Sequence, residues 1–166
     1  MITFRLATAS DIPDLLQLYS AARLRMASAG NPRQWTEGYP QRELLDEDIE
    51  AGRSYVMLDD DKTIMAAFVL LIGPDPNYRQ IDGAWLNDEP YATIHRLASR
   101  PDCHGIFHEC VRFCRTICAN LRVDTHRDNL IMQHLATKEG FHYCGIIRLI
   151  YKTADAERLA YQMAFP

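Results

Sequence analysis

The chain has 166 residues and a mass of 19.1 kDa, and 48% of its residues are hydrophobic and 24% charged. This is the composition of an ordinary globular protein, and a chain of this length buries about two-thirds of its unfolded surface, so we expect one domain over residues 1–166. Eighteen Lys and Arg against twenty-two Asp and Glu give a net charge of −4. Because no basic footprint is present, neither a nucleic-acid nor a membrane partner is expected.

Hydropathy and cysteine spacing bear on the compartment. No apolar run approaches the roughly 18 residues of a membrane span, and residues 1–16 carry too many charges for a secretory signal. The five cysteines are an odd number, and Cys110, Cys114 and Cys118 recur every fourth residue within an apolar pattern. This spacing is typical of reduced thiols on a packed helix. We therefore expect a cytoplasmic protein without a disulfide framework.

The N-terminal region predicts a strand followed by a helix. Ile2–Leu6 alternates apolar and polar side chains as a half-buried strand does. Thr8 and Asp11 have the spacing of a capping box, which marks the start of a helix. An apolar stripe then extends this helix to about Ser28.

A second helix and a hairpin are predicted next. The helix covers Gln41–Ala51, with Pro40 as its first residue and Gly52 closing it. Ser54–Leu58 and Thr63–Ile72 are β-rich runs separated by a short polar turn, which predicts two antiparallel strands.

Residues 73–90 are rich in loop-forming residues, with one irregular strand expected around Tyr78–Ala84. Aromatic residues are frequent here and in the segment after the first helix. They could line an acceptor pocket, or equally form core or dimer contacts. These aromatic residues are Trp35, Tyr39, Tyr78, Trp85 and Tyr91.

From residue 91 onward, strands and helices alternate. The expected elements are strand Ala92–Ala98, helix Cys103–Ala119, strand Leu121–Thr125, helix Asn129–Lys138 ended by Gly140, and strand Phe141–Tyr151. This alternation implies a right-handed crossover, a parallel strand pair and a ligand crevice at the carboxyl ends of those strands. The last run, Arg158–Phe165, is either a strand pairing back on residues 146–151 or a short helix, and we favour the strand. The fold class is α/β.

The order of elements and two local motifs resemble the GNAT acetyltransferase superfamily over nearly the whole chain. ATIHRLAS at 92–99 is similar to the family's fourth strand. LRVDTHRDNLIMQHLATKEGFHYCGII at 121–147 resembles its fifth strand, the helix led by asparagine, and the Gly-Phe pair opening its sixth strand. The resemblance implies a GNAT-like mixed central sheet, flanked by helices, in which the parallel strands 92–98 and 121–125 splay apart.

In this family the splayed strands bind a coenzyme, because they leave backbone groups free to pair with a pantetheine arm, while the following helix offers amides to a pyrophosphate. The resemblance implies acetyl-CoA as co-substrate. The implied cofactor-binding residues are Leu97, Ala98, Ser99, His104, Gly105, Ile106, Phe107 and Asn129. The loop RPDCHGIF at 100–107 departs from the family pattern, since it is short, has one glycine and includes the acidic Asp102, which predicts weakened coenzyme binding.

The resemblance also implies the catalytic residues. His95 lies where some family members place a histidine base, and imidazole titrates near neutral pH; the alternative is a hydrogen-bonded histidine packed in the sheet. The family's usual tyrosine acid corresponds to Ala136, so Tyr143 is the candidate substitute, with strand packing as the alternative. Asn129 either reaches the cofactor, caps its helix, or does both.

A metal site and a cysteine nucleophile were also weighed. His104 and His108 are spaced i, i+4, but no paired C-x-x-C motif accompanies them, so no metal is expected. Cys144 could accept an acyl group, yet direct transfer needs no such nucleophile, and a buried cysteine is the simpler interpretation.

The sequence therefore predicts an N-acyltransferase that moves an acetyl group from acetyl-CoA to a primary amine of a small molecule or peptide by direct attack. One alternative is a catalytically weak or inactive sensor or interaction module that retains the CoA cleft. Another is a metal-binding regulatory domain, which rests only on the cysteine and histidine count. Homodimers are common in similar proteins, so a homodimer is expected by analogy.

Overall fold

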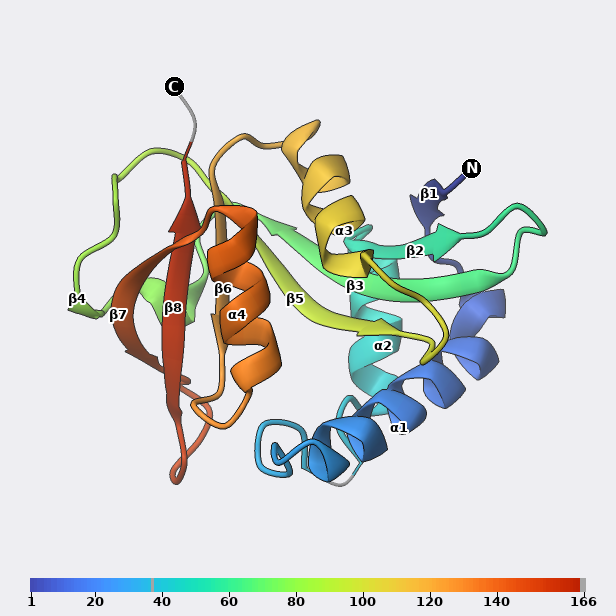
Figure 1. The fold of residues 1–166 in the computed structure, drawn as a ribbon, viewed down its shortest axis with the longest axis horizontal. Helices are drawn as coiled ribbons and strands as arrows, with labels where there is room; N and C mark the ends of the chain where they lie inside the picture. The colour runs from blue at the N-terminus through green and yellow to red at the C-terminus, as the bar shows by residue number, and fades with distance from the viewer. Residues whose placement is uncertain (37, 165–166) are drawn as a thin grey trace.

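A mixed sheet of eight strands organises the described part of the chain, which in this computed structural model comprises residues 1–36 and 38–164 (Figure 1). The strands are β1 (Thr3–Leu6), β2 (Ser54–Leu58), β3 (Ile64–Ile72), β4 (Asp82–Gly83), β5 (Ala92–Ser99), β6 (Leu121–Thr125), β7 (His142–Arg148) and β8 (Glu157–Met163). Their order in the sheet is β1-β2-β3-β5-β6-β8-β7-β4. Neighbouring strands are antiparallel except for β5 and β6. The predicted α/β class with one parallel pair is confirmed.

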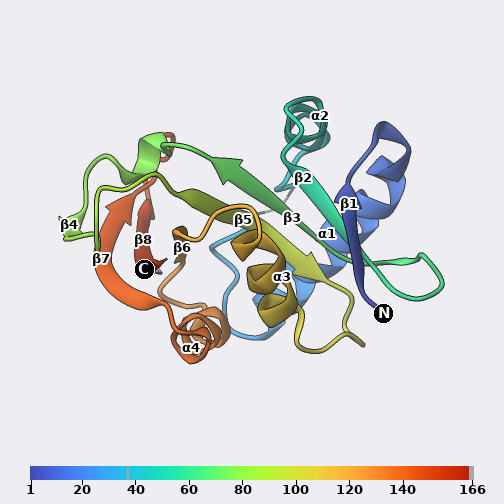
Figure 2. The ribbon, with the colours of Figure 1, turned by 90° about the horizontal axis from the view of Figure 1, so that it is seen from above.

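Four α-helices among the described residues cover the two faces of this sheet. They are α1 (Ile12–Ser28), α2 (Arg42–Glu50), α3 (Ile106–Arg115) and α4 (Leu130–Glu139). Viewed from above, α1 and α2 lie on one side of the sheet, and α3 and α4 lie on the other (Figure 2). None of the described helices combines the length and apolarity needed to cross a bilayer.

The helices follow from their apolar spacing. On α3, Phe107, Cys110, Val111 and Cys114 recur at i, i+3, i+4 and i+7, and all four are buried against the sheet. The two cysteines are free thiols used as small apolar side chains in this core. On the opposite face, Leu15 and its neighbours on α1 form a second core with α2, β2 and β3.

The first two helices begin slightly later than predicted. The capping box of Thr8 and Asp11 is present, but it opens the 3-10 turn Ala9–Asp11, after which α1 begins. Pro40 is not the first residue of α2, because Gln41 is the N-cap and the helix begins after it.

The helix after β5 is shorter than predicted. Gly105 has φ of 69° and is the N-cap, so residues 103–105 stay outside α3, which ends at Arg115 rather than Ala119. The backbone N–H of Cys103 donates to the Arg100 carbonyl and closes a turn before the helix.

Strand boundaries differ more in the loop-rich segment and near the C-terminus. Residues 76–78 form a 3-10 turn, and only Asp82–Gly83 pairs as a strand where a longer one was expected. β7 ends at Arg148, three residues short of the predicted end. The last strand is confirmed over Glu157–Met163, while residue 165 of the expected range lies outside the described residues. It pairs with both β6 and β7, because it inserts between them.

The parallel strands β5 and β6 separate soon after they begin. In the described residues they pair at Ala92–Leu121 and Thr93–Arg122 and no further along. On its other side β5 remains paired with β3, but the register shifts by one residue near Arg96, which has the left-handed φ of 49°. Such a β-bulge bends and twists a strand, and here it accompanies the departure of β5 from β6. The predicted splay is confirmed.

Candidate active site

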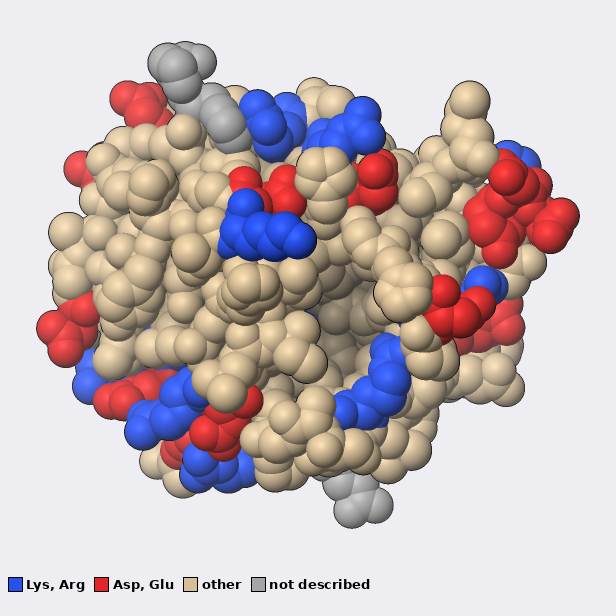
Figure 3. Space-filling model, viewed as in Figure 1, with Lys and Arg blue, Asp and Glu red and all other residues tan. Residues whose placement is uncertain are grey.

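A cavity of about 1260 Å³ lies where β5 and β6 separate. The space-filling view shows the hollow between the N-terminal and C-terminal halves of the molecule, with Lys or Arg side chains at its rim (Figure 3). Its walls come from β5, the start of α3, α4, the end of α1 and the loops at 29–39 and 149–152. Pockets for single drug-sized ligands are about 300–1,000 Å³, so this cavity has room for a large ligand and a smaller one together.

All eight residues that the resemblance assigned to cofactor binding line this cavity: Leu97, Ala98, Ser99, His104, Gly105, Ile106, Phe107 and Asn129. Beyond Thr93, the edge of β5 that faces β6 has no strand paired to it within the described residues. The first turn of α3 also presents amide groups that have no partner within the helix. Extended backbone beside a helix N-terminus can bind a strand-like arm that ends in a phosphate.

Gly105 caps the start of α3 in a backbone conformation that favours glycine. A Cβ at this position would meet nothing within 4 Å, so close packing does not require glycine. The left-handed φ of 69° requires it instead, because this conformation is unfavourable for residues with a side chain.

The basic residue of the short loop is already engaged in ion pairs. The Arg100 guanidinium contacts Asp102 at 3.1 Å and Asp59 at 3.5 Å. Two cations that sequence reasoning missed line the cavity instead: Lys138 on α4, and Arg25 on α1, which donates to the Ser99 carbonyl. No sequence motif links these residues to the loop, since they come from other elements.

His95 has a carboxylate partner that the sequence did not indicate. Its Nε2 lies 2.7 Å from Oδ2 of Asp75, whose side chain is 3% exposed. The backbone and side-chain nitrogens of Asn77 donate to the other oxygen of Asp75 at 2.9 and 3.0 Å. The backbone N–H of Asp75 donates to Oη of Tyr91 at 2.8 Å.

This arrangement fixes the charge and orientation of the pair. Burial alone would raise the pKa of Asp75, but the hydrogen bonds and charge of His95, with the bonds from Asn77, outweigh burial and lower it. Asp75 is therefore a carboxylate at neutral pH, and it accepts a hydrogen bond from Nε2–H of His95. In the neutral imidazole this hydrogen bond makes Nδ1 the nitrogen that can accept a proton.

Strand register places charged groups on one face of the sheet near His95. Thr93 pairs with Arg122 in β6, so His95 and Asp124, each two residues further, share that face. Asp124 pairs with Ala160 in β8, which puts Arg158 on the same face as well. Ile94 and Val123 point to the opposite face, into the core with α3. A group bound between the strands is thus reachable from the His95 face.

Comparison with known proteins places this site in a family. No family model matches the sequence, and neither does any curated protein. Among solved structures, a GNAT-family acetyltransferase from Streptococcus agalactiae 2603 is 30% identical, with a TM-score of 0.88 over 99% of this chain and 96% of that chain. This chain belongs to the GNAT family of acetyltransferases.

Two further structures are similar to this GNAT protein. An acetyltransferase from Staphylococcus aureus Mu50 is 25% identical, with a TM-score of 0.70 over 98% of each chain. The NatC complex bound to Gag peptide and CoA is 16% identical, with a TM-score of 0.59 over 99% of each chain, and shares the fold.

The structure does not bring Tyr143, the proposed acid, to the cavity of this GNAT protein. Its side chain is 56% exposed on β7, with its ring 5.6 Å from that of Tyr161, and it does not line the cavity. The sheet order is the reason, since β6 and β8 separate β7 from the gap beside β5. Tyr151, in the loop after β7, lines the cavity instead. Desolvation, followed by the neighbouring Tyr39 and Asp124, raises the pKa of Tyr151 to about 12, so its hydroxyl keeps its proton.

The five aromatic residues weighed for an acceptor pocket divide into two groups. Trp35 and Tyr39 line the cavity. The others pack around Arg122, whose guanidinium lies 3.9 Å from the ring centre of Trp85 and 3.8 Å from that of Tyr91. Tyr78 joins this cluster and donates through Oη to Asp124 at 2.5 Å.

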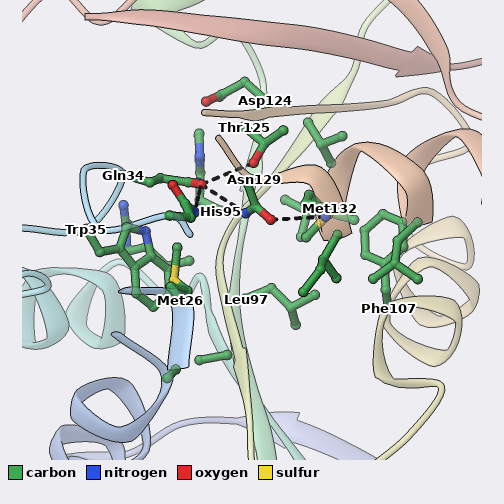
Figure 4. A pocket seen from close by; sticks show the side chains of 18 of the residues that line it. Met26, Gln34, Trp35, His95, Leu97, Phe107, Asp124, Thr125, Asn129 and Met132 are labelled. Carbon is green, nitrogen blue, oxygen red and sulfur yellow. Dashed lines mark hydrogen bonds between the residues drawn. The ribbon is translucent and has the colours of Figure 1, made fainter. Parts of the chain in front are cut away.

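Gln34 crosses from the loop after α1 to the junction of β6 and α4 (Figure 4). Its Oε1 accepts from Asn31 Nδ2 at 3.0 Å, Asn129 Nδ2 at 3.0 Å and Thr125 Oγ1 at 3.2 Å. Asn129 also caps α4 by accepting from the Met132 amide at 3.1 Å. Capping and a place in the cavity wall therefore coexist at Asn129.

Neither a reactive cysteine nor a metal site is formed by the described residues. Cys144 is buried, and desolvation raises the pKa of its thiol, which makes it a weak nucleophile at neutral pH. His108 pairs with Glu139 at 2.9 Å. Among the described residues, no three His, Cys, Asp or Glu side chains gather as metal ligands.

Proposed function

We propose that this protein is an N-acyltransferase that transfers the acetyl group of acetyl-CoA directly to a primary amine of a small molecule or peptide. The observation that supports it best is the position of the His95–Asp75 pair in the cavity between the splayed strands. A histidine base has to lie beside the bound thioester. His95 lines the cavity and has a buried carboxylate partner, Asp75.

In the proposed complex, the pantetheine arm of acetyl-CoA pairs with the backbone of Leu97–Ser99. The pyrophosphate lies at the N-terminus of α3, where unpaired amides and the helix dipole favour an anion. Lys138 on α4 lines the same cavity and adds a positive charge. These contacts place the thioester at the gap between β5 and β6.

The proposed chemistry begins when Nδ1 of His95 takes a proton from the acceptor ammonium. The freed nitrogen lone pair attacks the thioester carbon, and a backbone N–H near Leu97 or Ala98 stabilises the oxyanion. The C–S bond then breaks, and the thiolate takes the second proton that the new amide nitrogen loses. Asp75 stabilises the imidazolium and fixes its orientation, as a carboxylate does in other histidine-base systems.

The test is acetyl-CoA-dependent thiol release over a panel of amines, together with calorimetric titration of acetyl-CoA. We expect binding and turnover, and His95→Gln should lower kcat by about 10² or more while leaving acetyl-CoA binding unchanged, because general bases contribute 10²–10⁴-fold. A folded protein that does not bind acetyl-CoA would exclude this function. A His95→Gln protein with full activity would exclude the base.

A second candidate is a module that binds CoA without turnover. It is favoured by two departures from the family pattern: Arg100 is engaged by acids, and Ala136 is fully buried where a tyrosine acid is usual. Binding without thiol release for any acceptor would support this candidate over the enzyme.

A further inference from the structure

Arg158 on β8 is a buried cation that lines the cavity without a carboxylate partner. The residue is 3% exposed, and its Nη1 donates to the carbonyl oxygens of Asp155 at 2.9 Å and Glu157 at 2.7 Å. No described residue accepts a hydrogen bond from its Nε or Nη2, and no described carboxylate forms an ion pair with it. Because Nε and Nη2 are not among the fully buried atoms that lack a partner, they keep access to the cavity, where an anionic ligand would accept their hydrogen bonds.

Lys152 places a second unpaired cation on the same cavity wall. It lies in the loop between β7 and β8, and no described residue forms a hydrogen bond or ion pair with its ammonium. The loop is held at both ends: the Ile150 amide donates to Asn77 Oδ1 at 2.9 Å, and Asp155 contacts buried His126 at 2.9 Å. Lys152 is therefore presented to the cavity by an anchored segment.

No other described charged group at this end forms an ion pair with these cations, although the charge of Arg158 contributes to lowering the pKa of Asp155. Arg96 is paired with Asp48, at 2.7 Å. Asp124 is a diagonal neighbour of Arg158 across β6 and β8, and within the described residues no ion pair joins the two side chains. It engages the Tyr78 hydroxyl instead. Among the described residues that line the cavity near His95 are thus one carboxylate and two cations without an ion-pair partner.

We propose that the acceptor amine carries an oxyanion, a carboxylate or phosphonate, which Arg158 and Lys152 bind while the ammonium lies between Asp124 and His95. The inference rests on the proposed function, because it names the acceptor class of that transfer. It predicts amino acids and aminophosphonates as substrates and disfavours polyamines and simple alkylamines. Without the oxyanion, the Arg158 charge would stay buried and unpaired in the complex.

The experiment compares amino acids with the amines left by their decarboxylation, such as phenylalanine with phenethylamine and leucine with isopentylamine, and includes the matching 1-aminoalkylphosphonates. We expect kcat/KM at least tenfold higher for the acids than for the amines. The phosphonates distinguish a carboxylate site from a general oxyanion site. Lys152→Gln should lower kcat/KM for the acids about tenfold, because KM rises, and should leave kcat/KM for the amines unchanged. Lys62→Gln, in the exposed β2–β3 turn, is the charge-matched control.

A binding measurement keeps this inference separate from the proposed function. The same acids and amines are titrated calorimetrically into the protein with and without CoA, where no transfer occurs. If the acids bind and Lys152→Gln weakens that binding, the oxyanion site is supported even when no turnover is seen. The absence of turnover would then contradict only the proposed transferase function. Amines that match the acids in binding or turnover, equal losses for both classes in Lys152→Gln, or no binding of any acid would overturn the inference.

Discussion

His95 depends on Asp75 and Tyr91, which do not line the cavity, and on Asn77, which does. Asp75 bonds to its Nε2, and Asn77 and Tyr91 in turn hold the side chain and backbone of Asp75. Because this carboxylate is buried and fully bonded, it restricts the imidazole to one tautomer and one orientation. The reactivity proposed for His95 is therefore set by a loop folded against the sheet as much as by β5.

Replacing the carboxylate isolates its contribution. Asp75→Asn keeps the size of the side chain but removes the charge that stabilises an imidazolium, so kcat should fall by about 10², the lower part of the range for proton-transfer groups. The KM for acetyl-CoA should stay within twofold, since Asp75 does not line the cavity. Steady-state thiol-release kinetics measure both, with Asp88→Asn in the next loop, between β4 and β5, as the exposed control.

The same variant has a pH signature in stability. The folded-state pKa of Asp75 is lowered, so its contribution to the unfolding free energy is present above the unfolded value of about 3.9 and is lost as pH falls through the folded value. The difference between wild type and Asp75→Asn in urea unfolding should be largest near neutral pH and should shrink as pH falls below the unfolded pKa and through the lower folded-state pKa. A difference that persists in acid would show that packing, and not charge, is what Asp75 supplies.

Sequence reasoning reached some site residues and missed others for a physical reason. His95, Leu97–Ser99 and Asn129 occupy motifs whose spacing is local, and the structure places them in one cavity. Asp75 contacts His95 across 20 residues of chain, and Gln34 contacts Asn129 across 95. No local spacing in the sequence encodes such contacts. Tyr143 does not line the cavity because β8 and β6 lie between its strand and β5, and the neighbours of a strand cannot be read from local spacing.

Between elements, Gln34 is the main link from the N-terminal half to the start of α4. One side-chain oxygen accepts from donors on the loop after α1, on β6 and at the N-cap of α4. Arg33 adds an ion pair with Asp128 at 2.8 Å in the same place. These contacts close the end of the cavity opposite α3 and hold the cap of α4 in position.

Removal of that oxygen should loosen the link. Gln34→Ala leaves the donors of Thr125 and Asn129 without their acceptor, and we expect a loss of about 1–3 kcal/mol in unfolding free energy. Gln34→Glu keeps an acceptor oxygen of the same reach and should retain most of the stability. Chemical denaturation measures both variants, and equal stability of Gln34→Ala and wild type would contradict the role.

Most helices and strands could be predicted from the periodicity of apolar residues, but the residues at which they begin and end could not. The stripe on α3 identified the helix, while its start depended on the left-handed Gly105, which spacing alone does not reveal. The insertion of β8 between β6 and β7 was missed because periodicity identifies a strand and not its neighbours. The short β4 is held by close approach of Gly83 to Gly145, where a Cβ would meet backbone at 2.1 Å.

For the molecule as a whole, the splayed sheet connects two chemically different sides. The α3 and α4 side offers backbone amides and Lys138 to a phosphate-bearing carrier. The side of His95 offers Asp124, Arg158 and Lys152 to a small acceptor. The gap between β5 and β6 is where a thioester from one side and an amine from the other can meet.

Hydrogen–deuterium exchange with and without acetyl-CoA tests this arrangement most directly. The predicted result is slower exchange over residues 94–108, where the free edge of β5 and the first turn of α3 would contact the carrier, with no change in the β1–β2 pair. Unchanged exchange over residues 94–108, or protection confined to another part of the chain, would contradict it.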